Sequence, residues 1–591
     1  MIICRKNITI IILIFYLPIL ISSPVLGCKD ILACGDSTGG DYNLLLKVRD
    51  PSRPGLQVLS IVPKNYEYEF YHPWTGEKIF FKVENKYFGI TSKDDVIPNI
   101  VKAGMTLSDK GLAFGDADTN SNWINPSRYA WDDFDWIRYS CEKADNIDQA
   151  VLLLTEDVVN KYHAPGVSEN LFVIGPDSGY IIEADAFNYK IKEFVNDVGV
   201  MSNYPKELWK SQILKTLPIS ISYDFNTTDY FKVGDTIRLN SLYGIKIINI
   251  TESSILARQI PIFKINFWTF LFIGEKIEID IGERKNVGDF SLKVLDVEID
   301  KVKVELTNKF KAWENKMLEN INSKYGNITV KDMFNWSRLQ SVDLDGLRGM
   351  CEGIYEDEAV AIYKIPKNYY KSLSMGWFSP SFACSSIFVP FHISDNDIFD
   401  PYENGEAAQL CQNLFKIYGY NNLSCFNNIE NVFLYENEII ENIAVNIIEE
   451  EEILSDFLTI FDINAQKQAY LTEKIWFDID NLINQNEKEL CINIIENNWG
   501  LNYSNSLINM KYTVLNLLEL NNTFPIINNI IEIAFSVCKS RFDLADILGI
   551  ISEEGAQEYF FAEEYINNFE YEIGFNHLIK AYLIVENLIT E

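Results

Sequence analysis

The cysteine at position 28 directly follows a leader-like segment, and this limits the folds and chemistries that the chain can have. Residues 1–27 carry two basic residues, an apolar run over 8–21 and an ending of small residues at Gly27. The run is short for a membrane span, and the pattern is typical of a secretory signal peptide. Cleavage after Gly27 would place a thiol and a free α-amine together on Cys28. An α-amine with an ordinary pKa of about 7.7–8 can act as the thiol's general base, so the position predicts an N-terminal nucleophile.

The same position fits a second chemistry. Val25, Leu26, Gly27 and Cys28 also approximate a lipobox, in which the cysteine thiol is lipidated and the amine is often acylated. Lipidation would consume the nucleophile and hold the protein at a membrane surface. The two hypotheses exclude each other, and residues further along the chain must decide between them.

The acidic composition excludes one class of partner. Removal of the leader takes away two of the 51 basic residues and leaves 49 against 84 acidic ones, a formal charge of −35. Such a surface repels nucleic acid and anionic lipid. We therefore expect no nucleic-acid partner, and membrane contact only through a lipidated Cys28 or a retained leader. The expected location is secreted or extracytoplasmic, including the cell surface.

The spacing of cysteines, histidines and sequons bears on disulfides, metals and glycans. Beyond Cys4 and Cys28, eight cysteines remain, which allows four disulfides in a secreted chain. No CxxC pair is present and the four histidines lack paired spacing, so we expect no metal and no cofactor. The stretch 116–120 resembles half of a calcium loop, but Ser121 and Ser127 replace the required Gly and Glu, so a plain loop is predicted. Sequons, as in a secreted glycoprotein, occur at Asn226, Asn249, Asn327, Asn335, Asn422, Asn502 and Asn521.

The 564 residues after the leader are enough for two to four domains. Hydrophobic patterning divides them into four regions. Short strands and turns, with helices after them, run through 28–221, and the same pattern returns in 309–400. Between these regions, 222–308 alternates apolar and polar residues and predicts an inserted all-β module. The last region, 401–591, has Ile and Leu at helical spacing and predicts a mainly helical structure. Within the first region, 78–91 is expected to form one hairpin.

Several stretches, taken in order, resemble the N-terminal nucleophile (Ntn) hydrolases of the C69 dipeptidase and secernin type. Those proteins begin with the catalytic Cys, turn through an Asp/Gly-rich loop and then reach a Lys/Arg…Asp pair. Here Asp50 lies 22 residues after Cys28. The resemblance covers about 28–221 and 309–400. The stretches that carry it are 28–30 with 36–40 and 47–50, 103–105 with 108–112, 138–144 with 148–150, 180–184 with 201–203, and 374–377 with 384–391.

This resemblance implies an α+β fold and roles for particular residues. The fold would be the αββα four-layer sandwich of Ntn hydrolases, with the β module inserted into it and the helical region after it. Cys28 would be the nucleophile, Asp50 would anchor its α-amine, and Asn203 would donate a hydrogen bond to the oxyanion. Arg49 or Lys47 is expected to lower the pKa of the thiol.

The sequence departs from the family pattern at one motif, and another residue is a candidate replacement for an active-site residue of the family. The Asn of the family's Asn-Glu-x-Gly-Leu motif is Ser108 in this chain, or Thr106 if the loop is shifted, and one of them is the expected substrate contact. Arg348 is the candidate to replace a basic residue of the active site.

Together these features predict a secreted cysteine Ntn hydrolase that cleaves linear amide bonds through Cys28. The C69 resemblance implies dipeptides or short peptides as the small amide substrates, and hence a thiol peptidase. The first alternative is an acyl-amino-acid amidase or an acyltransferase on the same scaffold. The second is a lipid-anchored, catalytically inactive surface binding protein, which the lipobox-like sequence and the missing Asn favour. The sequence predicts no oligomeric state.

Overall fold

A computed structural model describes most of the chain. It covers residues 27–590 except 51–54, 100, 120, 122, 212–221, 239–242, 262–273, 288–289, 354–358, 422 and 501–505. The predicted leader over 1–27 therefore lies, apart from Gly27, outside the described residues. In the described part of the chain, no helix combines the length and the apolar composition needed to cross a membrane.

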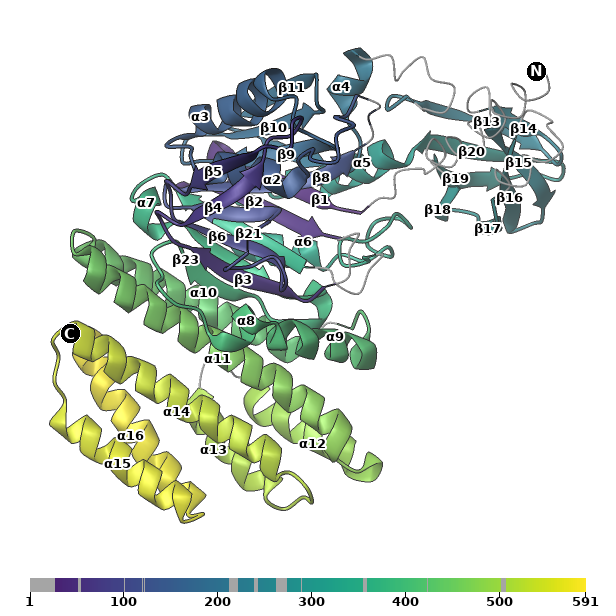
Figure 1. Cartoon of the computed structure of the whole chain (residues 1–591). Coiled ribbons are helices and arrows are strands. Elements are labelled where there is room, and N and C mark those ends of the chain that lie inside the picture. Colours follow the sequence, from purple (N-terminus) through teal and green to yellow (C-terminus); the bar gives the residue numbers. More distant parts are fainter. Residues whose placement is uncertain are drawn as a thin grey trace, which may run out of the picture.

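Two antiparallel sheets packed face to face form the centre of the molecule (Figure 1). The first sheet has the strand order β12 (Val198–Met201), β1 (Lys29–Ala33), β2 (Tyr42–Arg49), β21 (Ala359–Pro366), β22 (Met375–Ser379) and β23 (Val389–His392). The second has the order β11 (Tyr189–Phe194), β10 (Gly179–Ala184), β9 (Ser168–Ile174), β8 (Leu112–Thr119), β7 (Met105–Ser108), β6 (Tyr87–Ser92) and β3 (Gln57–Val62).

Helices cover the outer faces of both sheets, so the centre has four layers. On the second sheet lie α2 (Asp133–Cys141), α3 (Ile147–Leu152) and the π-helical stretch η2 (Leu153–Lys161). On the first sheet lie α5 (Lys309–Asn322) and α6 (Val330–Ser337). Capping boxes begin two of these helices, because Asp132 and Thr329 bond reciprocally with the third helical residue. The mixed α+β class with antiparallel sheets agrees with the sequence prediction.

The central strands of the first sheet are covered on both faces. Ile31, Leu32 and Ala33 of β1 and the run Leu44, Leu45, Leu46 of β2 are all wholly buried. A strand buried on both faces has a continuous apolar run rather than an alternating one, which explains these two segments. Their burial fixes where the chain just before β1 and just after β2 must lie.

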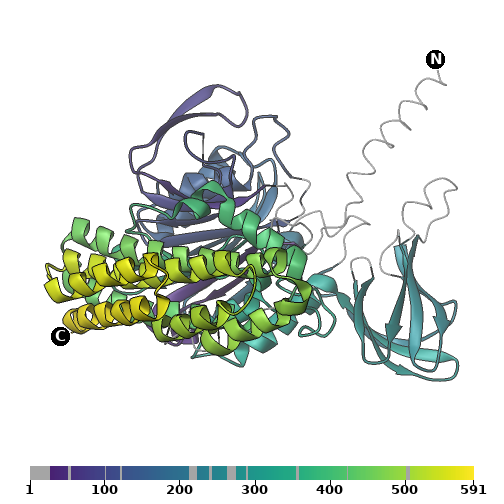
Figure 2. The same cartoon turned by 90° about the horizontal axis from the view of Figure 1, so that it is seen from below.

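Residues 226–308 form a separate pair of four-stranded sheets beside the main body (Figures 1 and 2). Their apolar side chains make a core of their own around Ile245, Phe290 and Val304. Whether 222–308 is an independent domain stays a prediction, as do the other domain boundaries. The strands are β13 (Asn226–Lys232), β14 (Thr236–Arg238), β15 (Tyr243–Ile250), β16 (Ser254–Pro261), β17 (Lys276–Asp280), β18 (Arg284–Val287), β19 (Phe290–Val297) and β20 (Lys301–Asn308).

The C-terminal region is helical and packs on the central sheets through one continuous apolar core. Its helices are α8 (Asp400–Asn404), α9 (Glu406–Tyr418), α10 (Ser424–Ala444), α11 (Glu451–Leu482), α12 (Gln485–Ile495), α13 (Ser506–Leu517), α14 (Phe524–Ile547), α15 (Glu553–Asn567) and α16 (Tyr571–Thr590). Buried polar contacts also join the two parts. Arg338 after α6 pairs with Glu430 of α10, and Glu473 of α11 accepts a hydrogen bond from the Ile387 N–H.

The prediction of one hairpin over 78–91 is wrong. The first of its two strands, β5 (Lys78–Lys82), pairs with β4 (Glu67–Tyr71) in a small separate sheet. The second is β6, which pairs with β3 and β7 in the second large sheet. Local alternation indicates a strand but does not identify its partner, because register depends on contacts distant in sequence.

We expect the substitution Glu430→Gln to destabilise the protein strongly. It leaves the buried guanidinium of Arg338 without its opposite charge, and breaking a buried ion pair costs about 3–5 kcal/mol of unfolding free energy. Urea unfolding followed by circular dichroism measures this loss. The control Asp300→Asn breaks the exposed pair with Lys232 and should leave the unfolding midpoint unchanged. Equal midpoints for both variants would contradict the role given to Arg338 and Glu430.

Candidate active site around Cys28

Strand pairing places Cys28 and Lys47 next to each other between the two sheets. In the β1–β2 register, Asp30 lies opposite Lys47. Side chains alternate along a strand, so Cys28 and Asp30 share one face of the sheet with Lys47. That face looks toward β8, where a β-carbon at Gly115 would lie 3.1 Å from Asp30 Oδ1 and 3.6 Å from Lys47 Cβ. Cys28 is only 7 % exposed.

Lys47 keeps its charge although it is wholly buried. Burial alone lowers the pKa of a lysine, but Asp116, Asp30 and Cys28 together raise that of Lys47 above its ordinary value. The Nζ atom lies 3.5 Å from Asp116 Oδ1 and 3.7 Å from Asp30 Oδ2. Lys47 is therefore an ammonium beside the Cys28 thiol at neutral pH.

The thiol itself is protonated in the chain as described, which retains Gly27. Burial raises the pKa of Cys28 to about 12, and Asp116, Asp118 and Asp30 add to this, while Lys47 opposes it. A thiol is nucleophilic only as thiolate, so Cys28 is unreactive at neutral pH in this environment.

Asp50 and Asn203 converge on the residue just before Cys28. The N–H of Gly27 donates a 2.8 Å hydrogen bond to Asn203 Oδ1. A β-carbon on Gly27 would lie 3.8 Å from Asp50 Oδ2 and 3.9 Å from Asn203 Oδ1. The same Asp50 oxygen, Oδ2, lies 3.4 Å from Arg348 Nη2. Four predicted site residues, Cys28, Asp50, Asn203 and Arg348, therefore lie within one neighbourhood, although their chemical roles stay predictions.

Asn203 reaches this position because β12 pairs with the other edge of β1. The register joins Asp30 to Met201, so the chain two residues beyond Met201 lies beside Cys28. The turn is held by Asn170, whose side-chain amide donates to the carbonyls of Ser202 and Tyr204.

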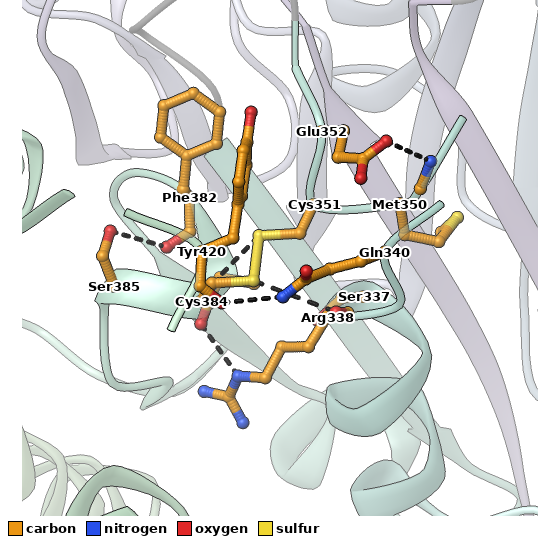
Figure 3. Close-up of a disulfide and its surroundings, with 12 residues drawn as sticks. Ser337, Arg338, Gln340, Met350, Cys351, Glu352, Phe382, Cys384, Ser385 and Tyr420 are labelled. Atoms are coloured by element: carbon orange, nitrogen blue, oxygen red, sulfur yellow. Dashed lines mark hydrogen bonds between the residues drawn. A yellow bond between two sulfur atoms is a disulfide. The ribbon is translucent and has the colours of Figure 1, made fainter. Parts of the chain in front are cut away.

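The disulfide between Cys351 and Cys384 (Figure 3) holds the loop on which Arg348 lies. Cys351, three residues further on, is bonded to Cys384 in the short 3-10 turn η5 (Ala383–Ser385) after β22. Phe382, Phe415 and Tyr420 pack around the bond. Lys29 Nζ donates to the Met350 carbonyl, and Trp313 Nε1 donates to the Arg348 carbonyl, both at 3.1 Å. These contacts fix the backbone from which Arg348 extends toward Asp50.

Three predicted site residues do not lie against Cys28. Arg49 donates to Gln57 and stacks on the Phe134 ring at 4.6 Å, so Lys47 rather than Arg49 is the cation beside the thiol. Thr106 lies near Cys141 of α2, and burial raises the pKa of that thiol.

Ser108 lies at the far end of β7 from the strand ends that carry the site. It pairs with Leu112 at the start of β8, and its hydroxyl accepts from the Lys110 N–H within the turn. The structure therefore brings neither Ser108 nor Thr106 to Cys28. The motif lies on the strand pair β7–β8, which contributes Asp116 near Cys28, but its own residues lie away from Cys28.

Sequence reasoning missed the buried pairing of Lys47 with Asp30 and Asp116. One signal was present, because Asp30 and Lys47 each adjoin an apolar strand run, where a buried charge needs a partner. Asp116 gave no such signal, because its stretch was predicted to be a loop, whereas it lies within β8.

We compared the chain with known proteins. It matches no family model, and a search of curated proteins finds no match. Solved structures that match include penicillin V acylase from Agrobacterium tumefaciens, at 12 % identity and TM-score 0.24, over 32 % of this chain and 59 % of that chain. Another is a mutant of conjugated bile acid hydrolase from Clostridium perfringens, at 8 % identity and TM-score 0.31, over 62 % of this chain and 92 % of that chain.

Both likenesses are distant. This chain spans about 59 % of the length of the acylase. The two TM-scores lie below 0.5, so neither match carries an argument about fold or activity. The assignment of C69 membership stays a prediction, and the case for function depends on the geometry around Cys28.

We expect seven free thiols in the chain that begins at Cys28. Among the described cysteines, Cys351 and Cys384 are bonded, and seven others are free and buried. Iodoacetamide in denaturant without reductant should therefore add seven alkyl groups by intact mass, and nine after reduction. The four disulfides that the cysteine count allows would instead leave one free thiol, and that result would contradict the structure.

Proposed function

We propose that the protein is an N-terminal cysteine amide hydrolase of the Ntn type, made active by removal of residues 1–27. The four-layer arrangement, with Cys28 between the two sheets at the start of β1, supports the Ntn-type αββα assignment. Secretion is part of the same proposal, because it depends on the leader.

One observation carries this proposal: Asp50 and Asn203 both lie against Gly27, on the amino-terminal side of Cys28. These are the two residues that the family resemblance assigns to the α-amine and to the oxyanion. In the intact chain Asn203 Oδ1 accepts from the Gly27 N–H, and Asp50 pairs with Arg348. Removal of Gly27 would leave a free amine and an open space at this place.

The chemistry follows from these positions. The α-amine of Cys28 takes the thiol proton, and the thiolate attacks the amide carbonyl while Lys47 stabilises the negative sulfur. Asn203 Oδ1 accepts from the Gly27 N–H before cleavage, so after cleavage the side-chain amide turns and its N–H donates to the oxyanion in the space that Gly27 occupied. The ammonium then protonates the leaving amine, the C–N bond breaks, and a thioester remains. Water activated by the same amine hydrolyses the thioester and releases the acid.

Asp50 and Arg348 are positioned to hold the α-amine during these steps. The Asp50 side chain is fully buried, and its contact with Arg348 orients the carboxylate toward the Gly27 position. A carboxylate beside the new ammonium stabilises the protonated form that must serve as the acid. Arg348 also keeps a partly exposed face, 18 % of its side chain, from which it could meet the carboxylate of a short peptide.

The proposed substrates are linear amides of small molecules, with dipeptides first because of the C69 resemblance. An acyl-amino-acid amidase or an acyltransferase uses the same acyl-enzyme, and the two differ only in what accepts the acyl group. Product that forms only when an acceptor amine is present would identify a transferase.

We expect activity of the chain that begins at Cys28 to depend on three residues. Cys28→Ala should abolish hydrolysis of dipeptide amides. Asn203→Ala should lower kcat about 10²–10³-fold through loss of the oxyanion donor. Asp50→Asn should lower kcat and shift the pH profile, because the α-amine loses its charged partner.

A matched control uses the second cysteine of the same region. Cys34 is buried at the end of β1, and Cys34→Ala should leave kcat unchanged. Mass spectrometry of the secreted N-terminus decides the lipid alternative, since a diacylglycerol adduct on Cys28 would overturn the hydrolase mechanism. Equal activity of wild type and Cys28→Ala would do the same.

We expect cleavage after Gly27 to change the reactivity of Cys28. Because the pKa of the thiol is raised to about 12 before cleavage, the thiol is protonated at all lower pH values and becomes thiolate only as the pH rises through that value. Iodoacetamide should therefore label Cys28 slowly at pH 7 in the uncleaved chain and rapidly in the cleaved one. Peptide mass spectrometry with Cys28→Ala as control locates the label. Equal labelling rates at pH 7 would contradict the proposal.

A further inference from the structure

Four acidic residues meet on the helix-covered side of the second sheet, and we name them the carboxylate cluster: Asp116, Asp118, Asp133 and Glu169. Asp116 and Asp118 lie two residues apart on β8 and point to the same face. Glu169 of β9 lies directly opposite Asp118 in the strand register. Asp133 is the first residue of α2, which packs on this face. Carboxylate oxygens of Asp116, Asp118 and Asp133 all lie within 4.8 Å of one another.

The positive charges nearby do not balance this cluster. Lys47 reaches Asp116, but it is shared with Asp30. Burial lowers the pKa of Arg49, and the nearby Asp116 and Asp133 oppose this. The guanidinium itself, however, donates its hydrogen bond to the neutral Gln57. No ion pair within the described residues joins Asp118, Asp133 or Glu169 to a basic side chain. Two cations thus face five carboxylates, Asp30 included.

Glu169 gives an independent indication of a missing ligand. Glu169 is 0 % exposed, and no donor among the described residues bonds to either of its carboxylate oxygens. A buried carboxylate without a partner is costly, so such a group holds a proton or faces a cation.

We propose that the carboxylate cluster binds one Ca²⁺ ion, with Asp116, Asp118, Asp133 and Glu169 as ligands. All donors are carboxylate oxygens, which hard cations such as Ca²⁺ prefer, and no sulfur or imidazole of the described residues belongs to the cluster. Asp118 is exposed and Asp133 is partly exposed, so the ion can enter from solvent and keep water ligands.

The geometry also explains why the sequence rules for a calcium loop fail here. A calcium-binding loop that began at Asp116 would need a Gly and a terminal Glu, and neither is present. In the structure Asp116 and Asp118 lie on a strand, so no tight turn is required. The missing acidic ligand comes from Glu169 on the neighbouring strand and from Asp133 on α2.

The site is separate from the proposed chemistry at Cys28. Lys47 lies between the two, since it contacts Asp116 and lowers the pKa of the Cys28 thiol. Calcium binding requires neither the free α-amine nor the thiol. It can therefore be tested in a Cys28→Ala background, where failure of the hydrolase proposal has no effect on the result.

The test is titration of the EDTA-treated, dialysed full chain with CaCl₂ by calorimetry, together with thermal unfolding with and without Ca²⁺. We expect one site per chain with a dissociation constant between about 10⁻⁶ and 10⁻³ M. Glu169→Gln and Asp118→Asn each remove one charged ligand and should weaken binding at least about tenfold. Asp148→Asn, at an exposed acidic residue of α3, is the matched control and should bind as wild type does.

Thermal unfolding distinguishes an ion site from a cluster that shares protons. With an ion site, Ca²⁺ raises the melting temperature of wild type and of Asp148→Asn, and raises it less in Asp118→Asn and Glu169→Gln. Absence of calcium binding by wild type would overturn the proposal, as would unchanged affinity in both ligand variants. If Glu169→Gln does not fold, the exposed Asp118→Asn variant decides the question alone.

Discussion

The pairing of β1 along both of its edges is the constraint on which the site depends. On one edge β2 brings Lys47 opposite Asp30 and ends next to Asp50, and on the other edge β12 leads into Asn203. Because both faces of these strands are buried, a shift of register by one residue would turn Lys47 into the apolar layer under α5 and α6. The hydrogen-bond ladder of three strands therefore determines which side chains surround the start of β1, and no single loop does.

The C-terminal helices support this arrangement from outside. Arg338 bonds to Glu430 and to the carbonyls of Ala383 and Ser386, so α10 holds the segment that carries Cys384. Cys384 in turn is bonded to Cys351, on the loop from which Arg348 reaches Asp50. A chain of covalent and buried polar contacts thus runs from a helix outside the resemblance to the carboxylate nearest the proposed α-amine. This is a structural reason for the helices to follow the sheets in one chain.

Sequence reasoning predicted the strands better than their partners. The apolar runs of β1 and β2 and the hairpin of β9 and β10 follow from local pattern and turn residues. The partner of β6 and the placement of Thr106 and Ser108 do not, because pairing distant in sequence decides them. Sequence alone left Arg49 and Lys47 as alternatives beside Cys28, because residues two apart on a strand share one face and only their contacts distinguish them. Asp116 was assigned to a loop because polar residues in a strand resemble a loop when its neighbours are unknown.

The burial of Cys28 and the chemistry proposed for it are consistent only if the chain is processed. A thiol whose pKa is raised to about 12 cannot attack an amide at neutral pH, and an intact peptide bond at its nitrogen offers no base. Removal of Gly27 supplies the base and at the same time frees Asn203 from the N–H it now binds. Asp50 then faces an ammonium instead of a glycine, so its buried carboxylate gains an opposite charge in addition to that of Arg348. The groups that surround Gly27 in the unreactive, uncleaved site, Asn203 and Asp50, are thus the ones that the free amine and the oxyanion would use.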